Sequence, residues 1–264
     1  AVAPTSDGTA GVSNPETLEE IGKVNPCSIS PGYRELYSIS AVESLVMFDE
    51  EMVMTLELLA GSWLNKPSQF QVTETSVVFQ TEKNTDFWQR SYYGFRNDNA
   101  PALLFESLEN FTLTAKAKFE YKKQFDQCGL IIYLDSENWF KSSVEFENNQ
   151  FSRLGSVVTN NGYSDWATSD ITLRPEIWYR LSRRGPDFLI EYSEDGYRFM
   201  QMRIFHLNAL GETTEEMGKA NPPLPTQEKM RFGVYACSPS CSTFRAEFTD
   251  LILEPCKWLP HTPA

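Results

Sequence analysis

The chain has 264 residues, with 36 Asp and Glu against 23 Lys and Arg, so its formal charge at pH 7 is −13. Hydrophobic residues make up 41% of the sequence and aromatic residues 13%, which supplies enough apolar surface for a core and excludes a wholly disordered or fibrous chain. The negative charge repels phosphate backbones, and no apolar run reaches the roughly 18 residues of a membrane span, so neither a nucleic acid nor a membrane is expected as a partner.

The N-terminal part of the chain differs in composition from the rest. Residues 1–15 are rich in Pro, Gly, Ser and Thr and are predicted to form a disordered tail, because they have few large side chains to bury. Residues 16–60 are predicted to be an extension partly packed on the core, with a short helix at 17–22. The pattern over 41–60 is compatible with either a strand near its end or a helix, and it does not decide between them.

From residue 61 onward, short runs of β-branched and aromatic residues alternate with turn residues. This spacing predicts an all-β domain over 61–254, a sandwich or a barrel, followed by a C-terminal tail at 255–264. The predicted strands are 70–72, 76–81, 111–121, 129–134, 139–148, 155–159, 177–184, 188–193, 199–205, 230–236 and 243–253. Residues 210–227 contain three prolines and are predicted to be a surface excursion between strands.

The strand at 139–148 has the most informative alternation. Because side chains alternate along a strand, one face is predicted to point into the core and the other to combine an aromatic ring, an ammonium group and carboxylates. The first face contains Phe140, Ser142, Val144 and Phe146, and the second contains Trp139, Lys141, Ser143, Glu145 and Glu147. The second set is typical of a sugar-binding groove. For this strand alone, a solvated outer face with a Lys/Glu pair is the simpler alternative.

Glu145 and Glu147 also raise the possibility of glycoside hydrolysis. They lie about 6.5 Å apart along a strand. This separation falls between the roughly 5 to 5.5 Å of retaining enzymes and the roughly 6.5 to 9.5 Å of inverting enzymes, so it decides nothing. Such a reaction also requires a carboxyl group that stays protonated, and the neighbouring Lys141 is expected to favour the ionised form of Glu145 instead.

Three further segments each place an aspartate beside aromatic residues: 85–89, 125–129 and 163–166. For any one segment, an aspartate in a turn and aromatic rings in the core are the simpler explanation. Taken together with Trp139, however, the segments add Trp88 and Trp166, which gives three indoles for the lining of one cleft.

Other catalytic or metal-binding patterns are scarce. The sequence has two histidines, His206 and His261, which argues against a Ser/His/Asp triad or a His-rich metal site, and no metal or cofactor is expected. Its five cysteines are few and odd in number, which favours reduced thiols and a cytoplasmic location. Cys237 and Cys241 indicate either a turn closed by a disulfide or two free thiols, in preference to zinc.

Several motifs occur together in a characteristic order. They are residues 63–67, 85–89, 93–95, 121 with 125–130, 137–141 with 145, 156–159, 164–166, 192–196 and 234–239. Over about residues 60–254 the chain therefore resembles the regulation-of-enolase family, which has a concanavalin A-like lectin/glucanase fold. The resemblance implies a jelly-roll sandwich of two curved antiparallel sheets with an N-terminal extension, and a ligand site on the concave sheet.

Carried over by motif position, the resemblance implies ligand-binding roles for Asp86, Trp88, Gln127, Trp139, Lys141, Glu145, Asp165 and Trp166. The leading hypothesis is a non-catalytic module that binds a carbohydrate or another small polar ligand and is linked to the regulation of sugar metabolism. Lys141 suggests a glycan or a sugar phosphate, since an ammonium group pairs with anions.

Two alternatives to a binding module stay open. One is a regulatory protein-interaction domain without a small ligand, whose acidic N-terminal segment contacts a metabolic enzyme. The other is a glycoside hydrolase or lyase, with Glu145 as acid/base and Glu147 or Asp165 as its partner.

Overall fold

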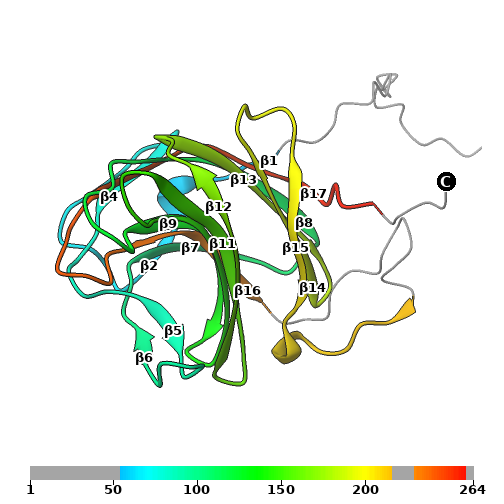
Figure 1. Cartoon of the computed structure of the whole chain (residues 1–264). Coiled ribbons are helices and arrows are strands. Elements are labelled where there is room, and N and C mark those ends of the chain that lie inside the picture. Colours follow the sequence, from blue (N-terminus) through cyan, green and yellow to red (C-terminus); the bar gives the residue numbers. More distant parts are fainter. Residues whose placement is uncertain (1–53, 216–228, 260–264) are drawn as a thin grey trace, which may run out of the picture. The chain divides into compact units, whose positions relative to one another are not determined.

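The computed structural model describes residues 54–215 and 229–259. Within these ranges the chain forms two large antiparallel sheets that pack face to face and a short two-stranded hairpin (Figure 1). This arrangement confirms the predicted all-β sandwich. The predictions for residues 1–53, which include the disordered tail and the helix at 17–22, and for residues 216–228 and 260–264 lie outside the described residues.

The first sheet has eight strands. In spatial order these are β15 (Met200–His206), β14 (Asp187–Ser193), β13 (Glu176–Arg184), β8 (Phe111–Phe119), β17 (Arg245–Pro255), β4 (Ser76–Gln80) and β3 (Phe70–Val72), with β1 (Met54–Thr55) also paired to β17. A 3-10 turn at Leu58–Ala60 follows β1, and a second one at Asn208–Leu210 follows β15. The described end of the ambiguous segment 41–60 therefore combines a two-residue strand with a short 3-10 turn.

The second sheet has seven strands and provides the platform for the site. In spatial order these are β12 (Tyr163–Thr172), β11 (Phe151–Asn160), β10 (Asn138–Phe146), β9 (Gln127–Asp135), β16 (Met230–Cys237), β7 (Ala102–Ser107) and β2 (Ser62–Leu64). Figure 1 shows this sheet as a curved layer, with the hairpin of β5 (Phe87–Gln89) and β6 (Arg96–Asp98) beside it at the lower left. The hairpin lies on the side away from the first sheet, because Phe87 packs on the outer face of the second sheet.

Alternation along β10 separates two hydrophobic layers. Phe140 and Val144 point into the space between the two sheets, where they join a large buried cluster. Trp139 points the other way and joins a smaller cluster beneath the hairpin, with Phe87 at 5.7 Å between ring centroids and Tyr235 in the same group. The inward face predicted from the sequence is therefore confirmed, and the outer face is itself partly covered.

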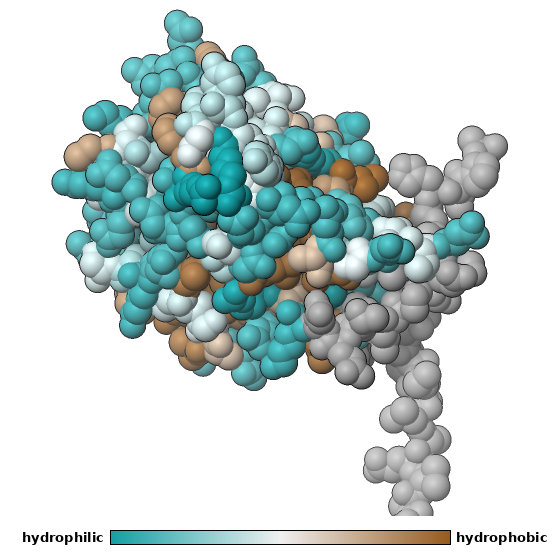
Figure 2. Space-filling model, turned by 90° about the horizontal axis from the view of Figure 1, so that it is seen from below, coloured by the Kyte–Doolittle hydropathy of each residue, from teal (hydrophilic) through white to brown (hydrophobic). Residues whose placement is uncertain are grey.

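Most of the apolar side chains in the described part of the chain are used in these two clusters. The face seen from below in Figure 2 is mainly hydrophilic, and its hydrophobic residues form small separate groups. None of the helices in residues 54–215 and 229–259 has the length and the apolar character needed to cross a bilayer.

Four segments of strand were not expected from the sequence: β2, β7, β12 and the β5–β6 hairpin. β7 is a nearly continuous buried run and β12 is an edge strand with mostly exposed side chains, so neither shows the alternation that marks a half-buried strand. The ends of the predicted strands differ from the observed ones by up to four residues, as at β11, which begins at Phe151 and not at residue 155.

Candidate functional site

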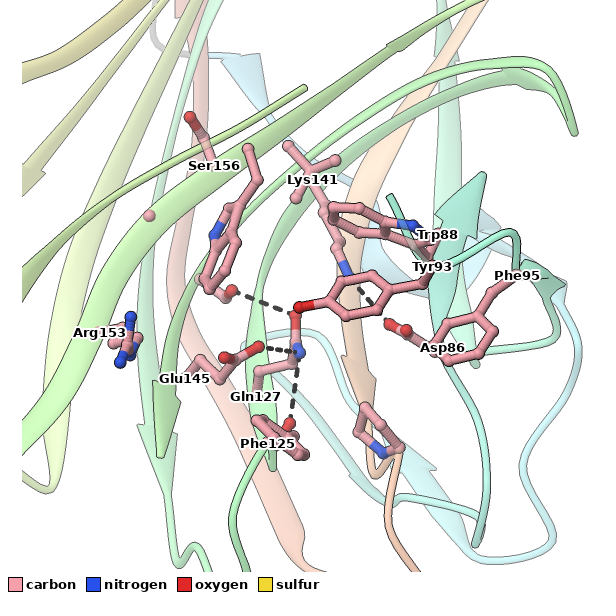
Figure 3. A pocket seen from close by; sticks show the side chains of 15 residues that line it. Asp86, Trp88, Tyr93, Phe95, Phe125, Gln127, Lys141, Glu145, Arg153 and Ser156 are labelled. Atoms are coloured by element: carbon pink, nitrogen blue, oxygen red, sulfur yellow. Dashed lines mark hydrogen bonds and ion pairs between the residues drawn. The ribbon is translucent and has the colours of Figure 1, made fainter. Parts of the chain in front are cut away.

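A cavity of about 330 Å³ opens on the outer, curved face of the second sheet (Figure 3). Strands β9 to β12 form its floor, and the hairpin and the segment after β16 contribute to its walls. Its lining residues are Asp86, Trp88, Tyr93, Phe95, Phe125, Gln127, Lys141, Ser143, Glu145, Arg153, Gly155, Ser156, Val157, Trp166 and Pro239.

Strand register brings the polar floor together. Lys141, Ser143 and Glu145 alternate along β10, so all three point to the outer face. Glu145 is paired with Gln127 on β9 and with Arg153 on β11. A local pattern in one strand thus becomes a two-dimensional array across three strands.

A buried ion pair lies at one end of the floor. Lys141 is 3% exposed, and its Nζ donates to Asp86 Oδ1 at 2.9 Å. The same carboxylate oxygen accepts a hydrogen bond from the Phe87 backbone N–H at 2.8 Å. Burial lowers the pKa of Lys141, but the charge of Asp86 and the nearby Cys237 outweigh this effect, so its pKa is raised above the ordinary value. Lys141 therefore stays positively charged, and its charge is paired with that of Asp86.

Glu145 lies in a different electrostatic environment. Burial raises the pKa of Glu145 to about 7, and the positive charge of Lys141 opposes the shift without cancelling it. Lys141 does favour the ionised form of Glu145, as the sequence indicated, but burial is the larger effect, and the Lys141 ammonium bonds to Asp86 instead of Glu145. At neutral pH the Glu145 carboxyl group can consequently hold or release a proton.

Gln127 connects the carboxyl group to the rest of the floor. Its Nε2 donates to Glu145 Oε2 at 2.6 Å and to the Phe125 backbone oxygen at 3.2 Å. Its Oε1 accepts a hydrogen bond from the Tyr235 hydroxyl at 3.0 Å, and a weaker one from Ser143 at 3.4 Å. This set of donors and acceptors fixes the orientation of the amide.

Aromatic rings form much of the cavity wall. Trp88, Tyr93 and Phe95 come from the hairpin, Phe125 precedes β9, and Trp166 comes from β12. Tyr93, Phe95, Phe125 and Trp166 are each between 39% and 53% exposed, so their rings face solvent as well as the cavity.

The eight residues predicted to bind a ligand do not all meet. Six of them line the cavity: Asp86, Trp88, Gln127, Lys141, Glu145 and Trp166. Their ligand-binding role stays a prediction.

The other two lie elsewhere. Trp139 is on the predicted face but is fully buried beneath the hairpin. Asp165 is next to Trp166 in β12, so the two side chains point to opposite faces of the strand. Asp165 pairs instead with Arg203 at 2.7 Å, next to a second cavity.

The lining also includes residues that were not among the predicted eight. Tyr93, Phe95 and Phe125 belong to motifs recognised in the sequence, but none of the three was assigned a ligand-binding role, and for the segment of Phe125 aromatic rings in the core were the simpler explanation. Arg153 had no sequence signal, because its position opposite Glu145 depends on strand register.

The two carboxylates proposed as partners of Glu145 do not line the cavity. Glu147 accepts a hydrogen bond from Arg153 Nε at 3.0 Å, and Asp165 pairs with Arg203. The second carboxylate in the lining is Asp86, which is distant from Glu145 in sequence and was not predicted as its partner.

The described residues contain neither a metal-binding cluster nor a disulfide bond. No cluster of three or more His, Cys, Asp or Glu side chains suitable for a metal ion occurs in residues 54–215 and 229–259. Cys237 and Cys241 are both free thiols, which settles the choice left open by the sequence. Cys237 is buried near Asp86, and burial raises its pKa well above the ordinary value, so it is a protonated thiol at neutral pH.

The two-sheet architecture and the cavity on its outer face define the chain as a concanavalin A-like β-sandwich protein. Residues 63–256 match the family model described as "Protein of unknown function (DUF1349)". The chain therefore belongs to this family.

Individual relatives agree with this assignment. The chain is 28% identical over 195 residues to "Regulation of enolase protein 1" from Saccharomyces cerevisiae, an alignment that covers 74% of this chain and 89% of the yeast protein. The crystal structure of a functionally unknown protein from Saccharomyces cerevisiae is 27% identical and superimposes with a TM-score of 0.64, covering 76% of this chain and 98% of the other.

More distant structures share the fold. The GH43 BlXynB protein from Bacillus licheniformis is 14% identical with a TM-score of 0.52, and the match covers 73% of this chain and 36% of the other. Bacteroides ovatus GH43B is 15% identical with a TM-score of 0.53, and the match covers 81% of this chain and 41% of the other. At this level of identity the likeness extends to the fold alone.

Proposed function

We propose that this protein is a non-catalytic binding module for a small neutral polar ligand, with a saccharide as the first candidate. The observation that carries the proposal is the combination of a polar floor with aromatic walls in one cavity of about 330 Å³. Sugars present apolar C–H faces and a rim of hydroxyl groups, which match aromatic rings and fixed hydrogen-bonding side chains.

The charges in the cavity favour a neutral ligand. Both cations of the lining are already paired, Lys141 with Asp86 at 2.9 Å and Arg153 with Glu147 at 3.0 Å. A sugar phosphate would have to displace one of these carboxylates, whereas hydroxyl groups can bond to them as they stand. We therefore rank a neutral saccharide above the sugar phosphate that Lys141 alone suggested.

The yeast relative supports a regulatory setting for this binding. Its name, "Regulation of enolase protein 1", links that protein to enolase. In this proposal a saccharide is the signal that the module receives, and a metabolic enzyme is the partner that responds to it.

Calorimetric titration tests the binding step. We expect saturable heats with a neutral monosaccharide or oligosaccharide from a panel that includes the matching phosphates, and we expect Trp166→Ala to abolish them. Trp178→Ala is the control, because Trp178 lies on β13 of the other sheet. The proposal would be refuted if no sugar gave saturable heats of binding, or if Trp166→Ala and Trp178→Ala gave the same heats.

A second candidate function is hydrolysis or elimination at a glycosidic bond. It is favoured by Glu145, whose pKa of about 7 suits a proton donor, in the same cavity as Asp86, which pairs with Lys141. This assignment replaces Glu147 and Asp165 by Asp86 as the partner carboxylate. Turnover of aryl glycosides that disappears in Glu145→Gln, with ligand binding retained, would support the enzyme over the binding module.

A further inference from the structure

Residues 90–95, which join β5 to β6, form a tight turn that we call the aromatic turn. Three of its residues have left-handed backbone conformations: Arg90 with φ 56°, Tyr92 with φ 60° and Gly94 with φ 72°. This conformation is unfavourable for Arg90 and Tyr92, which have a Cβ atom, so the surrounding contacts must maintain it.

Arg90 supplies the main anchor of the aromatic turn. Its guanidinium group donates to both carboxylate oxygens of Glu137 at 2.7 and 2.9 Å, and to the Gly162 backbone oxygen at 2.7 Å. Glu137 lies between β9 and β10, and Gly162 lies between β11 and β12. A Cβ atom at Gly162 would be 1.6 Å from an Arg90 nitrogen and the φ of Gly162 is +75°, so a side chain here would be strained and would displace the Arg90 guanidinium group. The aromatic turn is thereby attached to the end of the second sheet.

The turn holds its rings in a connected series. Trp88 contacts Tyr93 with ring centroids 5.5 Å apart, and Tyr93 stacks on Phe95 at 5.3 Å with an interplanar angle of 8°. Tyr92 contacts Tyr93 at 4.8 Å and is itself 95% exposed. Trp88 Nε1 donates to the Ser91 backbone oxygen at 3.0 Å, which ties the inner ring to the turn. The rings therefore extend from the cavity wall to the protein surface (Figure 3).

The residues of this series of rings indicate which kind of ligand binds to it. Large apolar rings on an anchored turn do not contribute to the core, since Tyr93 and Phe95 are 52% and 53% exposed. The positive charge of Arg90 is paired with Glu137, so it is not available to an anionic ligand. Rings continuous with a polar cavity match a ligand whose apolar faces repeat along its length.

We propose that the aromatic turn is an outer sugar-binding subsite, and that the ligand of this protein is a neutral oligosaccharide of at least two units. This inference rests on the proposed saccharide binding and specifies its class of ligand. One unit occupies the polar cavity above Gln127 and Glu145, and the next stacks on the rings of Tyr93 and Phe95. The anchored turn pre-forms this surface, so little ordering is required on binding.

The experiment is a calorimetric series with gluco-, xylo-, manno- and malto-oligosaccharides of one to four units. In the series that binds, we expect the disaccharide or trisaccharide to bind at least about tenfold more tightly than the monosaccharide. The variant Tyr93→Ala/Phe95→Ala should lose most of this gain. Because both rings also line the cavity, its affinity for the monosaccharide should fall too, but by a smaller factor than its affinity for the disaccharide or trisaccharide. Tyr197→Ala is the matched control, because Tyr197 is 92% exposed on the turn between β14 and β15 and should leave the gain intact.

A second variant separates the anchoring of the turn from its rings. Gly162→Ala retains every aromatic side chain but displaces Arg90, so oligosaccharide affinity should fall while monosaccharide binding and the circular dichroism of the folded domain are kept. Equal affinity for one and several units in the wild-type protein would overturn the outer subsite and leave monosaccharide binding standing. Saturable binding that is absent with all four series would overturn both.

Discussion

Replacing Asp86 by alanine tests the electrostatic structure of the cavity floor. The substitution removes the carboxylate that pairs with Lys141 at 2.9 Å and leaves the Lys141 ammonium group, which is 3% exposed, without a partner. It also removes the acceptor of the Phe87 backbone N–H. The Asp86 side chain is 17% exposed, so solvent screens the pair only slightly.

Breaking a buried pair by removing one partner costs about 3 to 5 kcal/mol. We expect about 3 kcal/mol for Asp86→Ala, at the lower end, because Lys141 can release its proton once the carboxylate is absent. For a domain of this size that corresponds to a fall in melting temperature of roughly 6 to 12 °C.

The stabilisation by the Lys141–Asp86 pair should decrease as the pH rises. In the native protein the pKa of Lys141 is raised, so the pair stabilises the fold below the ordinary lysine value of 10.5 and this contribution is lost as pH rises through the folded-state pKa. In Asp86→Ala the pKa of Lys141 should fall below its ordinary value, because the main charge that opposes the effect of burial is gone. The free energies of unfolding of the native protein and of Asp86→Ala should therefore differ most near neutral pH and become similar at alkaline pH.

Urea denaturation at pH 7 and at pH 10, followed by circular dichroism, measures both effects. Glu106→Gln is the control, because Glu106 and its partner Lys229 are 51% and 67% exposed and their pair should contribute less than about 0.5 kcal/mol. A loss in Asp86→Ala that is no larger than in Glu106→Gln would refute the claim that the Lys141 pair is buried and strongly coupled.

Three further outcomes follow from the same contacts. Burial raises the folded-state pKa of Glu145 to about 7, so the contribution of this group to the free energy of unfolding is present below pH 4.5 and declines as pH rises to 7. Over that interval the free energy of unfolding of Glu145→Gln, measured in urea titrations, should rise by up to about 3 kcal/mol relative to that of the native protein. Gly162→Ala should cost about 1 to 3 kcal/mol in the same assay, because φ is +75° and the new Cβ collides with Arg90; an unchanged midpoint would show that the turn tolerates a side chain. Trp139→Ala should cost about 3 to 5 kcal/mol, whereas Trp166→Ala should cost about 1 kcal/mol or less; similar losses would contradict the burial of Trp139 and the exposure of Trp166.

The sequence alone determined the local features of this protein. Alternation over residues 139–148 placed Phe140 and Val144 in the core and Lys141, Ser143 and Glu145 on the opposite face, as observed. This succeeds because side-chain direction in a strand repeats every two residues and needs no knowledge of distant partners. In β12 the same alternation separates Asp165 from Trp166, because adjacent residues of a strand point to opposite faces.

Only the tertiary structure decided which charges meet and which side chains solvent can reach. Lys141 pairs with Asp86, which is 55 residues away in sequence, and among the described residues no cation is bonded to Glu145. The β5–β6 hairpin buries Trp139 while it leaves Trp166 at the cavity wall. Desolvation and ion pairing depend on atoms from separate strands and turns, so the raised pKa of Glu145 and the aromatic walls around it are properties of the folded sheet and have no counterpart in the local sequence pattern.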